Sequence, residues 1–191
     1  MRAPQTVLTA LWLIWWLSWW AAAGWSGQTA SRPPLRQQIL YRVCAVAGVI
    51  LLFGGYNHRF AAEGILWRLT PAAAWIAVVV AVAGLAFTWW ARIHLGRLWS
   101  SNVARKADHH VVDTGPYRVV RHPIYTGITL ATIATAVMRG TVAGWAGVAI
   151  MTAGWYIKAR LEEGFLREQL GAEAYDAYAR RVPMLVPFLR S

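Results

Sequence analysis

The sequence predicts an all-α integral membrane protein, and three observations support this. The 191-residue chain is 58% hydrophobic and only 14% charged. Its apolar stretches are long enough, coiled as helices, to cross a bilayer. Polar loops, one of them broken by Pro33 and Pro34, separate these stretches. Together they predict a single polytopic domain of about five transmembrane helices, followed by a cytoplasmic C-terminal amphipathic helix.

The five spans are expected at about residues 7–25, 39–56, 71–90, 123–138 and 142–157. Residues 1–90 hold the first three, and residues 91–191 hold a polar loop, the last two spans and the C-terminal helix. A short turn at Arg139 and Gly140 makes spans four and five an antiparallel hairpin. Beyond span five, residues 158–181 alternate apolar and charged side chains at helical spacing, which predicts one long amphipathic helix leaving the membrane.

The first span carries a stripe of tryptophans whose spacing places them on one helical face. Such a face could line a groove for a lipidic ligand. More often it packs against neighbouring helices or anchors the helix at the interface, and we favour that interpretation. The residues are Trp12, Trp15, Trp16, Trp19 and Trp20.

The distribution of charge predicts an orientation and argues against a nucleic-acid partner. The net charge is +11, but the basic residues lie between and beside apolar spans, where they attract anionic membrane lipids. Fifteen of the 19 Lys and Arg residues fall on the side that carries residues 91–122 and the C-terminus. The positive-inside rule places that side in the cytoplasm. Cys44 is the one cysteine, so it forms neither an intrachain disulfide nor a thiolate metal cluster.

The segment from His109 to Gly127, HHVVDTGPYRVVRHPIYTG, is the strongest candidate for a functional site. It gathers three His, two Tyr and two Arg at the border of span four. A polar block at a membrane border is a functional candidate, although a solvated loop with a helix-starting Pro123 is the simpler alternative. The hairpin brings this block towards Lys158–Glu163 at the end of span five. Arg121 with Glu162 or Glu163 could also be a purely structural ion pair.

Several familiar chemistries lack their motifs. The sequence has no HExxH and no paired CxxC, so no metal site is predicted. It has no GxSxG elbow for a serine hydrolase. It also has neither GxGxxG nor a Walker loop, so a nucleotide-like ligand would be held by something other than these turns.

Four separated motifs resemble the isoprenylcysteine carboxyl methyltransferase family, a group of integral-membrane enzymes related to phospholipid N-methyltransferases. They are HHVVDTGPYRVVRHPIYTG, RLEEGFL, GAEAYDAY and RRVPMLVPF, and they span about residues 95–189. The resemblance implies a methyltransferase that uses S-adenosylmethionine and faces the cytoplasm. It assigns cofactor binding to His109, His110, Val111, Val112, Tyr117, His122, Pro123, Tyr125 and Glu162. It assigns catalysis and substrate binding to Arg121, Glu163 and either Lys158 or Arg160.

The acceptor and its chemistry stay open at this point. A lipidic or prenylated carboxylate is expected, giving O-methylation, and an amine acceptor such as a phospholipid headgroup is the alternative. A lipid-binding protein without catalysis and a nicotinamide-dependent membrane reductase are further alternatives. The sequence does not indicate an oligomeric state.

Overall fold

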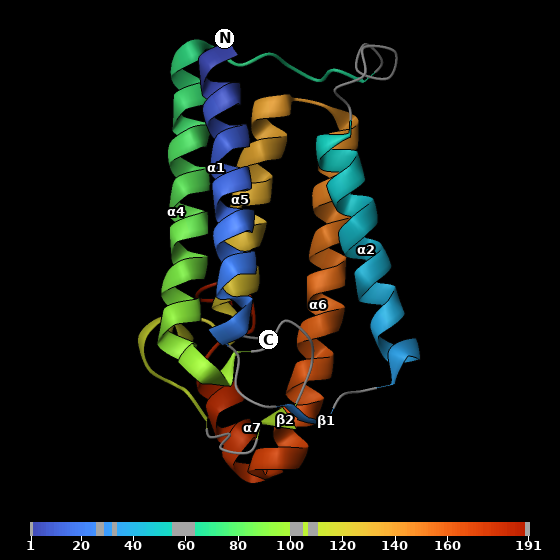
Figure 1. Ribbon diagram of the computed structural model, residues 1–191, viewed down its shortest axis with the longest axis vertical. Helices are drawn as coiled ribbons and strands as arrows, with labels where there is room; N and C mark the ends of the chain where they lie inside the picture. The colour runs from blue at the N-terminus through green and yellow to red at the C-terminus, as the bar shows by residue number, and fades with distance from the viewer. Residues whose placement is uncertain are drawn as a thin grey trace.

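The computed structural model describes residues 2–25, 29–31, 34–54, 64–99, 105–106 and 111–189, and in these ranges the chain is almost entirely helical (Figure 1). The all-α prediction is confirmed. The α-helices are α1 (Arg2–Ala21), α2 (Leu35–Phe53), α4 (Pro71–Leu95), α5 (Pro123–Arg139), α6 (Val142–Leu170) and α7 (Ala172–Arg181). Short 3₁₀ turns are η1 (Ala22–Trp25), η2 (Gly96–Leu98) and η3 (Gly115–Arg118). Strands β1 (Thr29–Ser31) and β2 (Arg105–Lys106), which were not predicted, pair antiparallel.

Three helices are long and apolar enough to cross a membrane: α1 with its following turn, α2 and α4. The expected count of about five is not confirmed. Helix α5 has 17 residues, which is at the short end for a span. Helix α6 has 29 residues, but its C-terminal half carries a dense run of charges. Both nevertheless lie side by side with the other three in the bundle (Figure 1).

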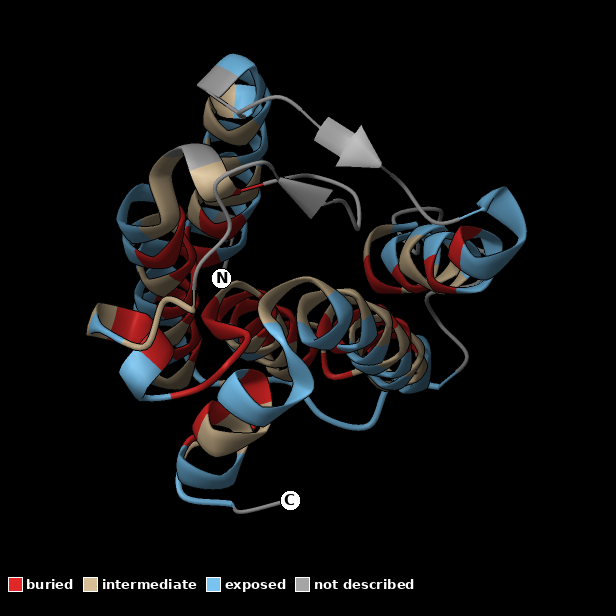
Figure 2. Ribbon diagram, turned by 90° about the horizontal axis from the view of Figure 1, so that it is seen from below, coloured by how far each residue is buried: buried red, intermediate tan, exposed pale blue. Residues whose placement is uncertain are grey.

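The bundle has two closely packed helix pairs, α4 with α5 and α2 with α6. In each pair two glycines let the backbones approach. A Cβ on Gly84 would lie 2.6 Å from the Gly127 carbonyl oxygen, and one on Gly147 would lie 2.8 Å from the Gly48 oxygen. Small residues at such crossings are typical of helix association in membranes. Figure 2 shows the consequence, since buried residues lie on the facing sides of the helices and exposed residues lie outside.

The tryptophans of α1 were expected either to pack against neighbouring helices or to line a groove, and different members of the stripe do each. Trp12 and Trp15 pack into the core with α4 and α5. Their indole N–H groups donate to Thr135 and Thr88 at 2.9 and 2.7 Å. Trp16 is 59% exposed on the outer surface. The stripe therefore does pack against neighbours as favoured, and part of it also lines the cavity described below.

The turn between α5 and α6 forms as predicted. Gly140 adopts the left-handed conformation (φ 60°, ψ 37°) that ends α5. A Cβ at this position would lie 2.3 Å from the Trp67 carbonyl oxygen, so only glycine fits. Thr141 then caps α6 by accepting a hydrogen bond from the Gly144 amide. This turn sets α5 and α6 antiparallel, and it brings residues 122–125 beside residues 158–163.

The predicted single helix over residues 158–181 is wrong in one respect. Helix α6 ends at Leu170, and Gly171 breaks the chain with φ 88° before α7 begins. Because Gly171 adopts a conformation that other residues rarely tolerate, the chain turns there. Helix α7 then lies across the lower end of the bundle, beneath the end of α4 (Figure 1). This turn closes one side of the site.

Candidate functional site

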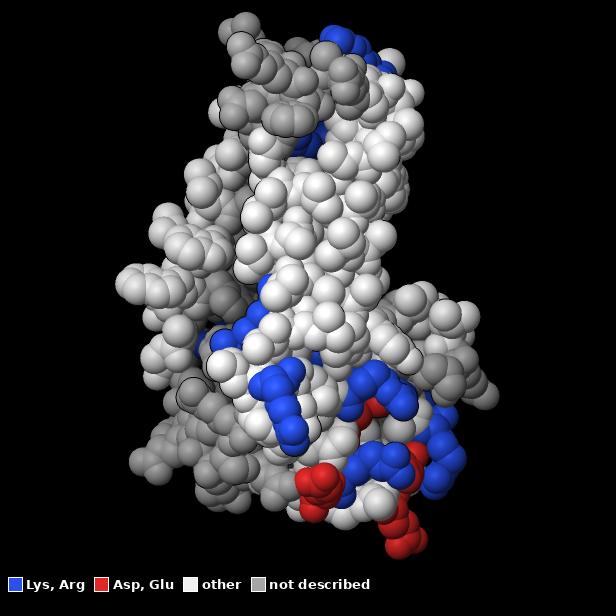
Figure 3. Space-filling view, turned by 90° about the vertical axis from the view of Figure 1, so that its right-hand side faces the viewer, with Lys and Arg blue, Asp and Glu red and all other residues white. Residues whose placement is uncertain are grey.

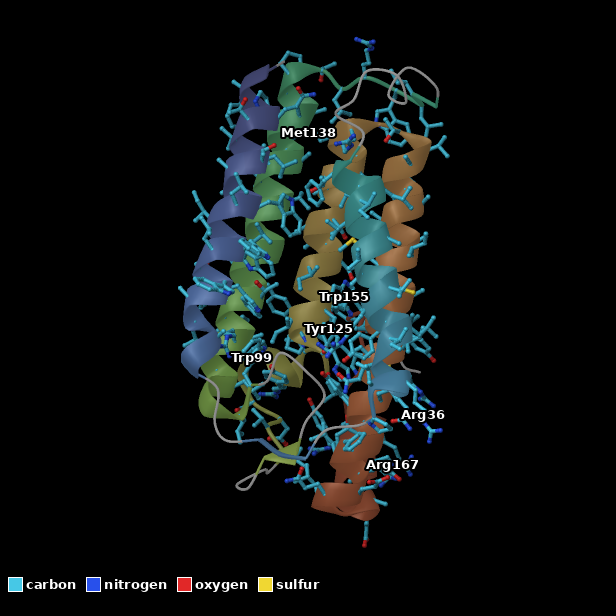
Figure 4. The ribbon with its side chains drawn as sticks, turned by 45° about the vertical axis from the view of Figure 1, so that its right-hand side comes forward. Arg36, Trp99, Tyr125, Met138, Trp155 and Arg167 are labelled. Carbon is cyan, nitrogen blue, oxygen red and sulfur yellow. The ribbon has the colours of Figure 1, made fainter. Side chains whose placement is uncertain are left out.

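A cavity of about 370 Å³ lies at the end of the bundle where α1, α4, α6 and α7 meet the start of α5. Its walls divide into a polar side from α5, α6 and the preceding loop, and an apolar side from α1 and the end of α4. Figure 4 shows Tyr125 and Trp155 within the bundle, with Trp99 near the end of α4. The lining residues are Trp15, Trp16, Trp19, Leu95, Leu98, Trp99, Val111, Val112, Tyr117, Arg121, His122, Pro123, Ile124, Tyr125, Ile128, Trp155, Lys158, Glu162, Phe165, Leu166, Gln169, Leu170, Tyr175 and Tyr178.

Four ionisable side chains form a cluster on the polar side, in which Arg121, His122 and Glu163 are buried and Glu162 is partly buried. The Arg121 Nε donates to the Glu163 carboxylate at 2.7 Å. The His122 ring lies between the two glutamates, with Nε2 at 3.2 Å from Glu163 Oε1 and Nδ1 at 3.5 Å from Glu162 Oε2. Each buried charge thus has a partner of opposite sign, which low-dielectric surroundings require.

The end of α7 and the chain after it bind this cluster from outside. The Arg121 Nη1 donates to the carbonyl oxygens of Ala179 and Val182. The backbone amides of Arg121 and His122 donate to Pro183 and Met184 at 2.8 and 3.1 Å. These bonds fix the backbone just before Pro123, where the rigid ring starts α5. The direction of the His122 side chain therefore depends on residues about sixty positions later.

Three aromatic rings stack along the cavity wall. Tyr125 lies parallel to His122, with centroids 5.5 Å apart and planes at 9°, and parallel to Trp155, at 5.4 Å and 7°. The Tyr125 hydroxyl donates to Glu162 Oε1 at 2.6 Å. The wall thus offers flat apolar faces beside a carboxylate, which suits a ligand with a planar or cationic part.

The two basic residues of α6 lie in different places. Lys158 is buried in the cavity wall, with its ammonium 5.4 Å from the centre of the Tyr125 ring. Arg160 is exposed and does not line the cavity. Their spacing explains this, because Lys158 shares a helical face with Glu162 whereas Arg160 points about half a turn away from that face.

Burial and neighbouring charges shift the pKa values of His122, Tyr117 and Tyr178. Burial alone would lower the pKa of His122, but its contacts with Glu162 and Glu163 outweigh burial and raise it, which favours the imidazolium. Burial raises the pKa of Tyr117 and also of Tyr178. Both therefore stay neutral phenols, and the Tyr178 hydroxyl donates to the Tyr117 carbonyl oxygen at 2.7 Å.

The structure brings most of the predicted site residues to this one cavity. Its wall includes Val111, Val112, Tyr117, Arg121, His122, Pro123, Tyr125, Lys158 and Glu162. Glu163 lies behind the wall, paired with Arg121 and His122. His109 and His110 lie outside the described residues. In the described part of the chain, no three His, Cys, Asp or Glu side chains are grouped so that they could hold a metal ion.

Sequence reasoning missed several lining residues on α6. Trp155 lies three and seven positions before Lys158 and Glu162, and Phe165 and Gln169 continue the same helical face. That periodicity was available in the sequence and could have identified them. Tyr175 and Tyr178 belong to the third motif, GAEAYDAY, but their approach to the cavity depends on the turn at Gly171.

Apolar helices in one bundle, with a cavity at one end that has a polar and an apolar side, are the features of an integral membrane protein with a candidate internal ligand site. The model of the isoprenylcysteine carboxyl methyltransferase family matches residues 75–167. This segment, just under half of the chain, is similar to that family. The match begins within α4, earlier than the resemblance in the sequence suggested, and it ends before α7.

Curated relatives agree with this assignment. A protein of Arabidopsis thaliana named protein-S-isoprenylcysteine O-methyltransferase B is 32% identical over 90 residues, which are 46% of this chain and 44% of the relative. Proteins of Oryza sativa subsp. indica and subsp. japonica, each named probable protein-S-isoprenylcysteine O-methyltransferase, are 30% identical over 113 residues, covering 59% of this chain and 53% of theirs. The chain spans about half the length of the curated relatives it matches.

Proposed function

We propose that this protein is an S-adenosylmethionine-dependent methyltransferase that esterifies the carboxylate of a prenylated or other lipidic acceptor. The observation that carries the proposal is the single cavity, which joins the Glu162, His122 and Tyr125 cluster to Lys158 and to an indole-lined apolar wall. The family and the names of the relatives supply the reaction class.

The cofactor fits the residues on the polar side. A volume of about 370 Å³ falls within the range of about 300 to 1,000 Å³ usual for small-molecule sites. Glu162 is suited to hold an ammonium group, and Arg121 or His122 to hold a carboxylate, by charge-assisted hydrogen bonds. The faces of Tyr117 and Tyr125 are suited to a purine ring or a sulfonium. When bound, S-adenosylmethionine supplies an electrophilic methyl group.

Lys158 is the residue we assign to the acceptor, in preference to Arg160. It lines the cavity, whereas Arg160 is exposed. A carboxylate is already ionised at neutral pH and needs no general base, so the protein has to orient it and exclude water. A buried ammonium in the wall serves both purposes, because it attracts the anion into an apolar enclosure.

The apolar wall supports a hydrophobic acceptor. Trp15, Trp16 and Trp19 of α1 line the cavity opposite α6. Trp16 is nevertheless 59% exposed, and Trp20, which is not among the lining residues, is 71% exposed, on a helix that is apolar enough to face lipid. An isoprenoid or acyl chain could thus pass from the bilayer to the cavity along aromatic surface.

The cavity is proposed to face the cytoplasm. Charged side chains gather at the lower end of the bundle in Figure 3, while the middle of that face is almost uncharged. The bias in Lys and Arg described above supports this orientation. Soluble cofactor would then reach the cavity directly.

Calorimetry on purified protein tests the cofactor site. We expect Glu162→Gln and Tyr125→Phe each to weaken S-adenosylmethionine binding by roughly tenfold to a hundredfold, because each loses part of a buried charge-assisted network. Arg160→Gln is the matched control on the same helix and should bind normally. Unchanged affinity in both site variants would refute the assignment.

Incubating lipid extracts with isotopically labelled S-adenosylmethionine tests the acceptor. Label recovered in a base-labile ester supports the proposal, and label recovered in an amine headgroup would instead show N-methylation. A non-catalytic lipid-binding protein would bind anionic vesicles and ignore the cofactor. A reductase would bind a nicotinamide nucleotide in the same titration.

A further inference from the structure

Arg92 is a buried cation that the proposed reaction does not use. It lies on α4, three residues before that helix ends at Leu95, and the helix is long and apolar enough to cross a membrane. The residue is 1% exposed and does not line the cavity. Among the described residues, no carboxylate is paired with it, and its Nε and Nη1 atoms are buried without a hydrogen-bond acceptor. A charged residue in such a place is a functional candidate.

Three contacts hold the guanidinium. Its Nη2 donates to the carbonyl oxygen of Ala22, directly after α1 ends. The last carbonyl groups of a helix lack partners within it, so this bond also satisfies the end of α1. The Arg92 Cζ lies 3.3 Å from the centre of the Trp99 ring and 5.5 Å from the centre of the Trp19 ring. Both distances are within the range of a cation–π interaction.

These two indoles belong to the apolar wall of the cavity. Trp19 and Trp99 both line it, and their rings meet edge to face, with centroids 5.6 Å apart and planes at 87°. Trp19 also stacks on Trp15, a third lining residue, at 4.9 Å. The guanidinium therefore contacts two of the three rings although it does not itself face the cavity.

The surroundings of Arg92 do not favour the stability of the fold. Two ring faces and one carbonyl oxygen replace the hydration of a cation only in part, and each buried donor without an acceptor adds a penalty. Replacing a buried charge by an apolar group of similar volume is often neutral or stabilising. The contacts with the wall are thus what this side chain contributes.

We propose that Arg92 is a positioning residue, whose guanidinium holds the Trp19 and Trp99 rings as the wall that receives the acceptor's hydrocarbon chain. The inference rests on the proposed function. A planar guanidinium stacks on an aromatic face and so fixes the angle of an indole ring. It also ties α1, which lies outside residues 75–167, to the segment that the family model matches. Helix α1 would then take part in acceptor recognition.

The test compares binding of N-acetyl-S-farnesylcysteine with that of N-acetyl-S-methylcysteine, which has the same carboxylate without the long chain. The measurement is calorimetry on full-length protein in detergent, and wild type is expected to prefer the farnesyl compound. R92M keeps an unbranched apolar stem, and we expect the preference to fall by roughly tenfold, the scale of a desolvated cation–π contact. Its unfolding midpoint should stay the same or rise, and its affinity for S-adenosylmethionine should be unchanged. R92K keeps the cation and should retain part of the preference.

Leu8→Ala is the control for looser packing of α1 on α4. Leu8 is 4% exposed in the core between these helices and does not line the cavity. The L8A variant should therefore have a lower unfolding midpoint and keep the preference.

Three results would overturn the inference: full farnesyl preference in R92M, an equal loss of preference in L8A, or an R92M midpoint well below that of wild type. The last would show that Arg92 serves only to stabilise the fold. Wild type that shows no preference and transfers no methyl group would instead refute the proposed function. The two failures are therefore distinguishable.

Discussion

Arg121 contributes to the structure as much as to the cavity. It pairs with Glu163 and donates to two carbonyl oxygens, that of Ala179 within α7 and that of Val182 just after it. Both side chains of the pair are almost fully buried, at 5% and 10% exposure. A buried ion pair adds little by itself, but removing one partner leaves an uncompensated charge in a medium that solvates it poorly.

We therefore expect Glu163→Gln to lower the free energy of unfolding by about 3 kcal/mol. The measurement is denaturant or thermal unfolding in a fixed detergent. Arg167→Gln is the control, because Arg167 and Asp176 form an exposed pair with side chains 52% and 34% exposed. That change should cost less than about 1 kcal/mol. Similar losses in the two variants would contradict the special role of the buried pair.

Because of His122, the protein should become less stable as the pH rises. Burial acts to lower its pKa, but Glu162 and Glu163 raise it above the ordinary value of 6.5. A raised pKa in the folded state means that the imidazolium stabilises the fold below pH 6.5 and that this contribution is lost as the pH rises through the folded value. Wild type should therefore lose stability as the pH rises above about 6.5 and through the raised folded-state pKa of His122.

His122→Gln supplies the comparison for this pH dependence. The amide does not titrate, so the difference in unfolding free energy between wild type and variant should shrink as the pH rises. A difference that stays constant across that range would show that His122 does not gain a proton on folding.

At the scale of the helix, the glycine contacts between α4 and α5 set the geometry. We expect Gly84→Val to destabilise the protein by about 3 kcal/mol, because a Cβ there would lie 2.6 Å from the Gly127 oxygen. Gly164→Ala on α6 is the matched control, since nothing lies within 4 Å of its added Cβ. That change should be neutral or stabilising by up to about 1 kcal/mol. Size-exclusion profiles and unfolding midpoints would measure both.

The elements could be predicted where local chemistry dictates them. Pro71 and Pro123 begin helices, and Gly140 makes the hairpin turn, as their sequence positions indicate. The break at Gly171 was missed because the charged and apolar residues keep a helical period across it. A glycine within such a pattern is compatible with either a continuous helix or a turn, and tertiary packing of α7 decides between them.

At the scale of the whole molecule, orientation is testable with single cysteines. In a Cys44→Ala background, Val142→Cys lies at the hairpin end of the bundle and Glu173→Cys on α7 at the opposite end, both at exposed positions. A membrane-impermeant maleimide on intact cells should label the first and not the second, because the cavity end is proposed to face the cytoplasm. The second should react after permeabilisation. The reverse pattern would contradict the proposed orientation.

The sequence predicted those site residues that stand out by their polar chemistry and their spacing. It did not predict contacts that depend on how distant helices pack. The Arg121–His122–Tyr125 block and Glu162 stand out as polar residues in an apolar chain. Tyr41 does not, because its contact with Lys158 depends on how closely α2 packs against α6. Gly154 permits the close approach of α2 to α6, and no local sequence pattern predicts that approach.

The carbonyl groups of Pro183 and Met184 fix the backbone at Arg121 and His122. During biosynthesis these two residues therefore lack their supports until the ribosome has translated some sixty further codons. The α5–α6 hairpin can enter the bilayer earlier, but the cavity cannot take its final form. A protein assembled in this order would remain unable to hold a ligand in this cavity while it is still being made.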